Sequence, residues 1–488
     1  MKNIILGFYG FFLIFVAGCL AVPLLIALIY NETECIIAFL FAILITILPG
    51  MYIRTTRGVS FEEGNLKLRY SYLLVSSAWI IATVVGSLPF IMSGSIPDFI
   101  DALFETCSGF TTTGSTILSD VEALPRSILF WRCLTQWLGG MGIMVLFVAL
   151  LPGIGIKARN IASAETPGPT VTKVSSRFFE TARLLYVAYI VLTVVLIVLL
   201  LLGGMSLYDA VCHAMTCMAT GGYSTYNDGI SHFNSPYIYW ILTLFMFIAG
   251  TNFNLFFFVI KGKISKLLGD DEFRFYLISV LLAIVLVVIS LMTEGHYTDL
   301  FKAVTDSAFQ VVTIVSTTGY ATANYIKWPA FAQMILVILM LTGASSSSTS
   351  GGIKEVRVLV FIRMIRFEIK RILHASIVDD IKYNGKKMAP ETLTYIMTFL
   401  STYFITLLVG TFLISVTGDG NLVSNFTAAL TCISNVGPGL DMVGPECNFH
   451  FYSGFGKLVL SFLMVAGRLE LSTFMIIFTR HFWRHDSL

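Results

Sequence analysis

Four short segments share one pattern of residue types, and a backbone built from them offers cation coordination. Each segment ends in a glycine that lies 13 positions after an Asp or Ser. The four tripeptides that close the segments are Thr112-Thr113-Gly114, Thr220-Gly221-Gly222, Thr317-Thr318-Gly319 and Asn435-Val436-Gly437. Glycine reaches backbone angles that are closed to other residues, so the successive carbonyl oxygens of such a run can face one axis. A ring of carbonyl oxygens can replace the hydration shell of a cation.

The residues before each glycine predict a helix that enters a membrane without crossing it. The expected N-terminal caps, whose side chains accept hydrogen bonds from free backbone N–H groups, are Asp101, Asp209, Asp306 and Ser424. About ten helical residues span roughly 15 Å, which is half of the hydrocarbon thickness of about 30 Å. The negative end of each helix dipole would then point at the membrane centre, where it favours a cation.

The elements that position these segments are expected to be membrane spans. Of the 488 residues, 56% are hydrophobic and only 12% are charged. A soluble domain has roughly 25% charged residues, so a soluble globular protein is excluded. Apolar runs near the length that crosses a bilayer, about 20 residues, recur at 4–30, 35–53, 71–92, 128–152, 183–204, 236–260, 274–292, 329–343, 392–416 and 453–480. The first run has no small-residue cleavage site and is expected to be a retained span.

Together the repeats and spans predict an all-α polytopic membrane protein with about ten transmembrane helices. The glycines are 108, 97 and 118 residues apart, and each repeat lies between two spans. Four re-entrant units in a pseudo-fourfold arrangement would therefore surround one pore. The expected units are an extra N-terminal hairpin over 1–66 and pore repeats over 67–160, 161–262, 263–375 and 376–488, the third with an interrupted second span.

The charges predict the orientation of the chain. If both termini are cytoplasmic, 25 of the 31 Lys and Arg residues lie on the inner side, as the positive-inside rule requires. The other side then receives 15 of the 29 acids, and an acidic entrance concentrates cations; the alternative is that these outer loops are simply polar. A net charge of +2 gives no reason to expect a nucleic-acid partner.

A run of small and polar residues interrupts the eighth span and is a candidate gate. Residues 342–352 read TGASSSSTSGG in the middle of an otherwise apolar stretch. Such a run cannot face lipid as a helix and must line water or protein, unless it is a cytoplasmic linker. The gate residues expected here are Gly343, Ser345, Ser346, Ser347, Ser348, Gly351 and Gly352.

Arg468 is the second candidate gate residue. It lies at the centre of the last apolar run, where an ionised guanidinium costs at least about 2.5–3.5 kcal/mol. Facing the pore below the filter, Arg468 would repel cations and hydrogen-bond the 342–352 segment. An ion pair with Glu470 is the alternative, although residues two apart on a helix do not share a face.

These motifs resemble the membrane subunits of bacterial Trk potassium uptake systems, in the Trk/Ktr/HKT superfamily. The resemblance covers about residues 70–482, and the hairpin over 1–55 is typical of the Trk branch. Potassium-selective members carry glycine at the four filter positions that are occupied here by Gly114, Gly222, Gly319 and Gly437. The fourth loop, residues 435–439, departs from Thr-x-Gly, but its Asn-Val-Gly-Pro-Gly form also resembles the family's.

The resemblance implies potassium uptake across the bacterial inner membrane through a selective, gated pore. Potassium is then the transported ion, and no cofactor or transition-metal site is expected. A Na⁺- or H⁺-coupled symporter on the same fold is the first alternative, and a membrane-embedded enzyme or scaffold is a remote one. The sequence contains no Walker A, His-Glu-x-x-His or Gly-x-Ser-x-Gly motif, so an enzyme is not expected.

A basic inner surface is expected to bind a partner. Residues 354–390 carry nine Lys and Arg, and Asn384-Gly385 predicts a tight hairpin within them. The resemblance implies a homodimer and a peripheral nucleotide-binding regulatory subunit on this face, whereas the basic residues by themselves are equally consistent with anionic membrane lipid.

Overall fold

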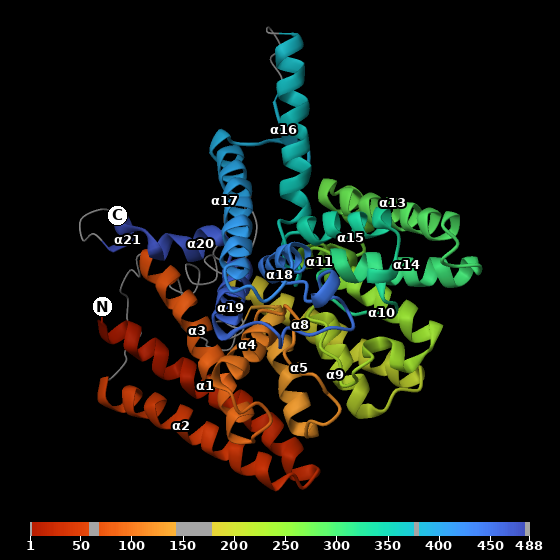
Figure 1. The fold of residues 1–488 in the computed structure, drawn as a ribbon. Coiled ribbons are helices and arrows are strands. Elements are labelled where there is room, and N and C mark those ends of the chain that lie inside the picture. The colour runs from red at the N-terminus through yellow and green to blue at the C-terminus, as the bar shows by residue number, and fades with distance from the viewer. Residues whose placement is uncertain (1, 58–67, 143–177, 375–379, 484–488) are drawn as a thin grey trace.

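The computed structural model describes residues 2–57, 68–142, 178–374 and 380–483, and these parts are mostly helical. Within them, six helices are long and apolar enough to cross a membrane: α1 (Lys2–Ile29), α2 (Thr33–Arg57), α3 (Leu68–Met92), α8 (Phe178–Leu202), α13 (Asp271–Thr293) and α17 (Pro390–Ser415). The predicted all-α polytopic membrane architecture is confirmed. The hairpin of α1 and α2 lies at one edge of the molecule, and the two helices meet at Gly10 and Gly50 (Figure 1).

Four short helices lie between the first and second spans of the repeats. These pore helices are 12 to 16 residues long: α4 (Phe99–Phe110), α9 (Leu207–Met218), α14 (Leu300–Val315) and α18 (Leu422–Ser434). The second spans begin with α5 (Arg126–Gly140), α10 (Pro236–Ala249), α15 (Ala330–Thr342) and α19 (Gly454–Arg468).

The packing between repeats closes into a ring. The second span of each repeat packs against the pore helix of the next one: α5 on α9, α10 on α14, α15 on α18, and α19 back on α4. Because α19 returns to the first pore helix, all four pore helices surround one axis.

The predicted pore-helix caps are wrong in every repeat. The residues that accept hydrogen bonds from the first free N–H groups are Asp98, Ser206, Asp299 and Asn421. Three of the predicted caps are instead the third residue of the first helical turn, so that their own N–H groups donate to the true cap: Asp101, Asp209 and Ser424. Asp306 lies about two turns into α14, because this helix has 16 residues.

Continuous second spans over 236–260 and 453–480 are also a wrong prediction. The pair α10 and α11 (Phe253–Ile260) is bent by 100° at its break, where the Asn252 side chain caps α11. The helix α19 ends at Arg468, and α20 (Leu471–Met475) follows Glu470, whose φ is +57°. Arg468 therefore stands at a helix break and not at the centre of a continuous span. Each break falls at a short polar stretch, Gly-Thr-Asn at 250–252 and Gly-Arg-Leu-Glu at 467–470, but hydropathy averaged over the longer apolar runs on both sides does not reveal it.

The third repeat has the break that was predicted. After α15, the chain is irregular until α16 (Glu355–Leu373), which projects beyond the rest of the molecule (Figure 1). In the first repeat α5 ends at Gly140, and the predicted span beyond residue 142 lies outside the described residues. The predicted hairpin is confirmed: β1 (Lys382–Tyr383) pairs with β2 (Lys386–Lys387) across Asn384 and Gly385, both at positive φ.

Short helices complete the described chain: α12 (Ile264–Leu268), α21 (Arg480–Trp483), η1 (Gly229–Phe233), η2 (Tyr325–Lys327), η3 (Asp441–Val443) and η4 (Ile476–Phe478).

Two glycines let the second spans approach the ends of the pore helices. A Cβ atom on Gly139 of α5 would lie 1.8 Å from the carbonyl oxygen of Phe110. A Cβ atom on Gly467 of α19 would lie 2.0 Å from the carbonyl oxygen of Ile433. Phe110 and Ile433 each precede their filter glycine by four residues, so the first and fourth repeats share this contact.

We expect Gly139→Ala to destabilise the protein and Gly18→Ala, its control, to leave it unchanged or slightly more stable. The new methyl group at 139 would meet backbone, and overpacking of this kind costs about 1–3 kcal/mol. At Gly18 no atom lies within 4 Å, and alanine in a helix gains roughly 0.5–1 kcal/mol over glycine. Thermal unfolding of the detergent-purified variants measures both effects; equal midpoints for Gly139→Ala and wild type would contradict the packing described here.

Candidate functional site

Each pore helix ends in the same backbone turn, which starts the candidate filter. The first residue of each filter tripeptide has a left-handed φ of 54–58°: Thr112, Thr220, Thr317 and Asn435. The N–H group of the following residue bonds the carbonyl five positions earlier, as Thr113 does to Ser108 at 2.9 Å. This is the Schellman arrangement that ends helices, in which Gly or Asn usually takes the left-handed position. Threonine is strained there in three repeats, and such strain gathers at functional sites.

The four filter glycines form a closed ring of contacts. All four have positive φ, between +77° and +102°. A Cβ atom on Gly114 would lie 2.2 Å from the carbonyl oxygen of Gly221, and one on Gly222 would lie 2.0 Å from that of Thr318. Likewise, Gly319 faces the carbonyl of Val436 at 2.2 Å, and Gly437 faces that of Thr113 at 2.6 Å. Every repeat thus contributes one carbonyl that adjoins the glycine of the preceding repeat.

A hollow of about 340 Å³ opens directly on this ring. Its lining includes all four filter glycines, with Asp228 and Glu446 among the residues farther out. The structure therefore brings the four predicted filter tripeptides together, from loops spread over more than 300 residues of sequence, and their glycines lie at the floor of one cavity.

Polar side chains of the first three pore helices lie against the chain that leaves the filter loop, and the sequence analysis missed them. They lie four positions after the wrongly predicted caps. In the first repeat, Glu105 accepts from the Ile117 N–H at 3.0 Å and from the Thr116 hydroxyl at 3.0 Å. In the second, the Nε2 atom of His213 lies 3.0 Å from the Ser224 hydroxyl. The sequence does contain a feature that indicates these residues, which is a polar residue at the same position of the first three pore helices, Gln310 being the third. All three side chains are buried.

Glu105 also forms a buried ion pair beside the filter. Its carboxylate accepts from the Nε atom of Arg132 in α5 at 2.8 Å, and both side chains are buried. The Arg132 guanidinium lies 4.0 Å from the ring centre of Tyr223, which follows the second filter glycine. Removing one partner would leave a buried charge uncompensated, so this pair fixes the first pore helix, its second span and the second filter loop relative to one another.

The four residues that were predicted as caps serve as anchors for other segments. Asp209 accepts from the hydroxyl groups of Thr225 and Tyr226 at 2.8 and 3.1 Å. Asp306 accepts from Thr322 at 3.2 Å, and Ser424 donates to Asp441 at 2.8 Å.

In the first repeat the corresponding anchor joins the two ends of the ring. Asp101 on α4 pairs with Lys457 on α19 at 2.5 Å. In the outer loop of the fourth repeat, hydrogen bonds from Ser424 and Asn421 lower the pKa of Asp441, which keeps its carboxylate charged.

The candidate gate segment lies against the inner side of the filter. The N–H group of Gly351 donates to the Thr317 hydroxyl at 2.7 Å, and a Cβ atom on Gly351 would lie 2.0 Å from the carbonyl oxygen of Ser434. The segment folds back on itself, because a Cβ atom on Gly343 would meet the carbonyl of Gly351 at 2.5 Å. Of the predicted gate residues, Gly351 therefore adjoins the filter directly, and Gly343 packs against Gly351.

Other elements hold this segment through hydrogen bonds to its polar residues and backbone. The Ser345 N–H donates to the carbonyl of Gly250 at 3.0 Å, and the Phe253 N–H donates to that of Ser347 at 3.1 Å. Both partners stand at the break between α10 and α11. Buried Glu272 of α13 accepts from the N–H and the hydroxyl of Ser346 at 2.5 and 2.8 Å. Glu272 was not predicted. The feature of the sequence that could have indicated it is an acidic residue near the start of an apolar span.

Arg468 joins three repeats at the level of the helix breaks. Its guanidinium donates to the carbonyl of Thr349 in the gate segment at 2.7 Å. It also donates to the carbonyls of Gly139 and Gly140 at the end of α5, both at 2.6 Å. The predicted contact between Arg468 and the 342–352 segment is thus present. Glu470 pairs with Arg357 of α16 at 2.6 Å.

A further basic residue that contacts the gate segment, Lys354, is buried and was not predicted. Its side chain is 2% exposed, its φ is +81°, and its ammonium donates to the carbonyl of Ser350. Two basic side chains, Lys354 and Arg468, therefore contact the segment that lies against the filter.

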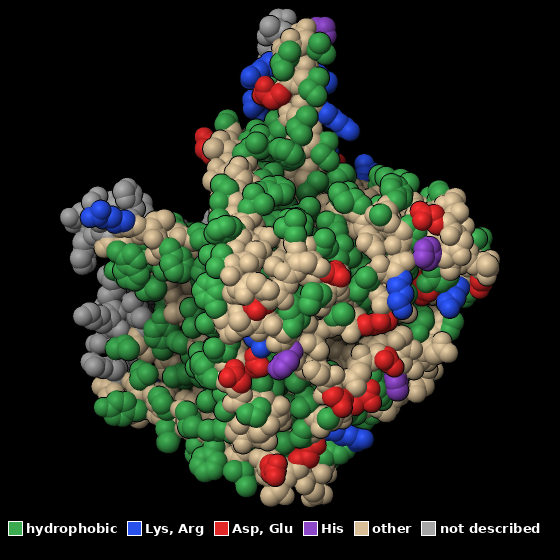
Figure 2. Space-filling model, in the orientation of Figure 1, with side chains coloured by type: hydrophobic (Ala, Val, Ile, Leu, Met, Phe, Trp, Pro, Cys, Tyr) green, Lys and Arg blue, Asp and Glu red, His purple; other side chains and the backbone are tan. Residues whose placement is uncertain are grey.

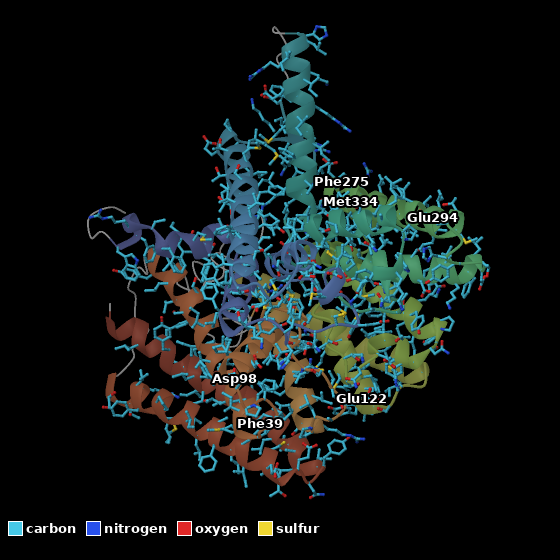
Figure 3. All side chains as sticks on the ribbon, in the orientation of Figure 1. Phe39, Asp98, Glu122, Phe275, Glu294 and Met334 are labelled. Atoms are coloured by element: carbon cyan, nitrogen blue, oxygen red, sulfur yellow. The ribbon has the colours of Figure 1, made fainter. Side chains whose placement is uncertain are left out.

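The charges separate along the molecule. Figure 2 shows Lys and Arg side chains on the projecting α16, whereas Asp and Glu predominate on the lower part of the same face. Asp98, which caps α4, and Glu122, in the loop before α5, both lie away from the tip of α16 (Figure 3). The acids are thus concentrated toward one end and the basic helix toward the other.

Comparison with known proteins agrees with this architecture. A model of the TrkH family, described as cation transport protein, matches residues 35–484. The Trk system potassium uptake protein TrkH of Escherichia coli K12 is 34% identical over 97% of this chain and 98% of its own length. The TrkG protein of the same organism is 31% identical over 95% and 94%.

The fold is also that of a solved relative. The crystal structure of the potassium transporter TrkH from Vibrio parahaemolyticus superposes with a TM-score of 0.88, at 31% identity, over 99% of this chain and 100% of that chain. Sequence and fold agree over nearly the full length, and the chain belongs to the TrkH family of cation transport proteins.

Proposed function

We propose that this chain transports K⁺ into the cell through one selective, gated pore. The observation that carries the proposal is the ring in which each filter glycine adjoins a carbonyl of the next repeat, at the floor of an open cavity. Its relatives are named potassium uptake proteins, and members of this family are transporters and not enzymes. Potassium is the cargo, and the proposal requires no cofactor.

The route of the ion follows from the charges and dipoles of the site. Acids at the outer end raise the local concentration of cations. The C-terminal ends of α4, α9, α14 and α18 direct the negative poles of four helix dipoles toward the filter. Carbonyl oxygens of the filter tripeptides then replace the water ligands of the ion. Because the four tripeptides differ in sequence, we expect selectivity to be looser than in a ring of four identical loops.

We propose that the gate segment together with Arg468 closes the inner end of the pore. The segment adjoins Thr317 and Ser434 at the filter, and a cation that leaves the ring inward meets Lys354 and Arg468. Displacing the segment would remove both the obstruction and part of the positive charge.

We also propose the orientation of the chain in the membrane and the partners that it binds. We place both termini in the cytoplasm of a bacterial inner membrane, because this orientation puts most Lys and Arg residues inside. The Trk systems named among the relatives support a multi-component assembly. The basic α16 and its neighbouring hairpin would bind a peripheral nucleotide-binding regulatory subunit, and we propose that the membrane subunit is a homodimer. Anionic lipid remains the competing ligand of this basic surface.

Coupled transport is the second candidate function. A K⁺ symporter on the same fold would show uptake that depends on a Na⁺ or proton gradient. A channel-like subunit would instead equilibrate K⁺ in liposomes that carry neither gradient. Folded protein that passes neither Rb⁺ nor K⁺ would contradict both candidates.

We expect Gly114→Ser to reduce the selectivity of Rb⁺ uptake into proteoliposomes. The added Cβ atom would lie 2.2 Å from the Gly221 carbonyl oxygen, so one ring ligand must move. The ratio between the K⁺ and Na⁺ concentrations that each halve Rb⁺ uptake should change by roughly tenfold or more. A tenfold change equals about 1.4 kcal/mol of discrimination between the two ions. Na⁺, Li⁺ and Cs⁺ serve as competitors. Gly94→Ser is the control, because Gly94 also has positive φ but no atom within 4 Å.

We expect Arg468→Ala, and deletion of Ser345–Ser348, each to raise Rb⁺ uptake by the isolated membrane subunit severalfold. Both changes loosen the segment that obstructs the filter, and Arg468→Ala also removes a positive charge from the inner end. Arg480→Ala is the control, since Arg480 is exposed and near the C-terminus. Unchanged flux in both gate variants, with the protein folded, would refute the assignment of the gate.

A further inference from the structure

The second filter loop lacks the side chains that brace the first and third loops. In the first repeat the hydroxyl groups of Thr111 and Thr113 lie 2.8 Å apart. In the third repeat those of Ser316 and Thr318 also lie 2.8 Å apart. Each pair ties the middle filter residue to the end of its pore helix. The corresponding residues of the second repeat are Ala219 and Gly221, which carry no hydroxyl group.

A side chain from another element fills the empty position. Gln136 of α5 is fully buried and belongs to the first repeat. A Cβ atom on Gly221 would lie 2.3 Å from its Cδ atom. The Gln136 amide thus occupies the space that a threonine side chain at 221 would need, and only glycine fits at 221 while Gln136 is there.

Gln136 also fixes the backbone on both sides of the second filter glycine. Its Nε2 atom donates to the carbonyl of Gly221 at 2.6 Å. Its Oε1 atom accepts from the N–H group of Tyr223 at 3.1 Å. A backbone N–H can only donate and a carbonyl can only accept, so these two partners determine the orientation of the amide.

We propose that Gln136 is a positioning residue that sets the ion selectivity of the filter, an inference that rests on the proposed function. The Gly221 carbonyl is the one that adjoins Gly114 in the ring. A carbonyl oxygen has two lone pairs, so Gln136 holds this ligand in place with one and leaves the other free. Among the four ring carbonyls, those of Thr113, Gly221, Thr318 and Val436, only that of Gly221 accepts a hydrogen bond from a side chain within the part of the chain that the structure describes. The hydrogen bond from Gln136 therefore fixes the Gly221 carbonyl and offsets part of the negative charge on its oxygen. The donor belongs to the first repeat, whereas the carbonyl belongs to the second.

The test separates the hydrogen bonds of Gln136 from its volume. Gln136→Met keeps the volume and removes both hydrogen bonds. We expect the Na⁺ concentration that halves Rb⁺ uptake to fall roughly three- to tenfold, because a net hydrogen bond of this kind is lost from one ring ligand. Gln333→Met is the matched control. Gln333 in α15 also donates to two backbone carbonyls, those of Ile326 and Trp328 at 2.6 and 3.0 Å, but these lie outside the filter tripeptides.

A combined variant tests whether a pair of hydroxyl groups, as in the third repeat, can replace Gln136 in the second filter loop. Gln136→Ala with Ala219→Ser and Gly221→Thr empties the space and gives the second loop the sequence of residues 316–320. We expect this variant to regain the selectivity of the wild type, whereas Gly221→Thr alone should disrupt the filter. A purely structural role for Gln136 would change yield or stability and leave the Na⁺ competition unaltered.

The outcomes are distinguishable. Wild-type Na⁺ competition in folded Gln136→Met, or a folded combined variant that stays less selective, would overturn the proposal. If Gln136→Met does not fold, the combined variant decides: wild-type selectivity supports the proposal, and lowered selectivity overturns it. Absence of Rb⁺ and K⁺ uptake by the wild-type protein would instead refute the proposed function itself.

Discussion

The structure depends on one constraint, which is that irregular backbone at membrane depth must find its hydrogen-bond partners inside the protein. The second spans of the second, third and fourth repeats break near the same level, and α5 of the first repeat ends at Gly140. Helix ends leave carbonyl groups without intrahelical partners. Arg468 and the gate segment supply donors to these carbonyls: Arg468 to Gly139 and Gly140, and the segment to Ala249 and Gly250. The breaks and the gate therefore stabilise each other.

The same constraint applies to the backbone groups at the C-terminal ends of the pore helices. Four pore helices end inside the protein, and each Schellman turn satisfies two of the exposed carbonyls while it turns the chain toward the axis. The turn requires a left-handed residue, and the return of the chain requires a glycine two positions later. The close approach of neighbouring loops then excludes any Cβ atom at that glycine. The same type of helix end therefore accounts for the positions of Thr or Asn and of Gly in all four tripeptides.

Much of this could be predicted from the sequence, because it repeats. The four glycines, the pore helices before them and the interrupted third repeat all follow from residue type and spacing. The caps could not be placed correctly, since Asp101, Asp209 and Ser424 lie three residues after residues that cap equally well, Asp98, Ser206 and Asn421. The breaks at Asn252 and Glu470 coincide with short polar stretches, but the long apolar runs around them make each segment look like one continuous span. Contacts between repeats, such as Gln136 with Gly221 or Glu272 with Ser346, join residues that no local pattern connects.

The position of Arg468 links the opening of the gate to the hydration of the pore. A guanidinium at this depth needs polar partners continuously, because its transfer from water is costly. In the conformation described here one of these partners, the carbonyl of Thr349, belongs to the gate segment. If the segment withdraws, this hydrogen bond is lost and must be replaced, and water that enters the vacated space is the nearest available acceptor. Water entering that space also lets a cation leave the filter without losing its hydration. If Arg468 holds the gate shut as proposed, it requires, once the gate opens, the same water that permeation needs.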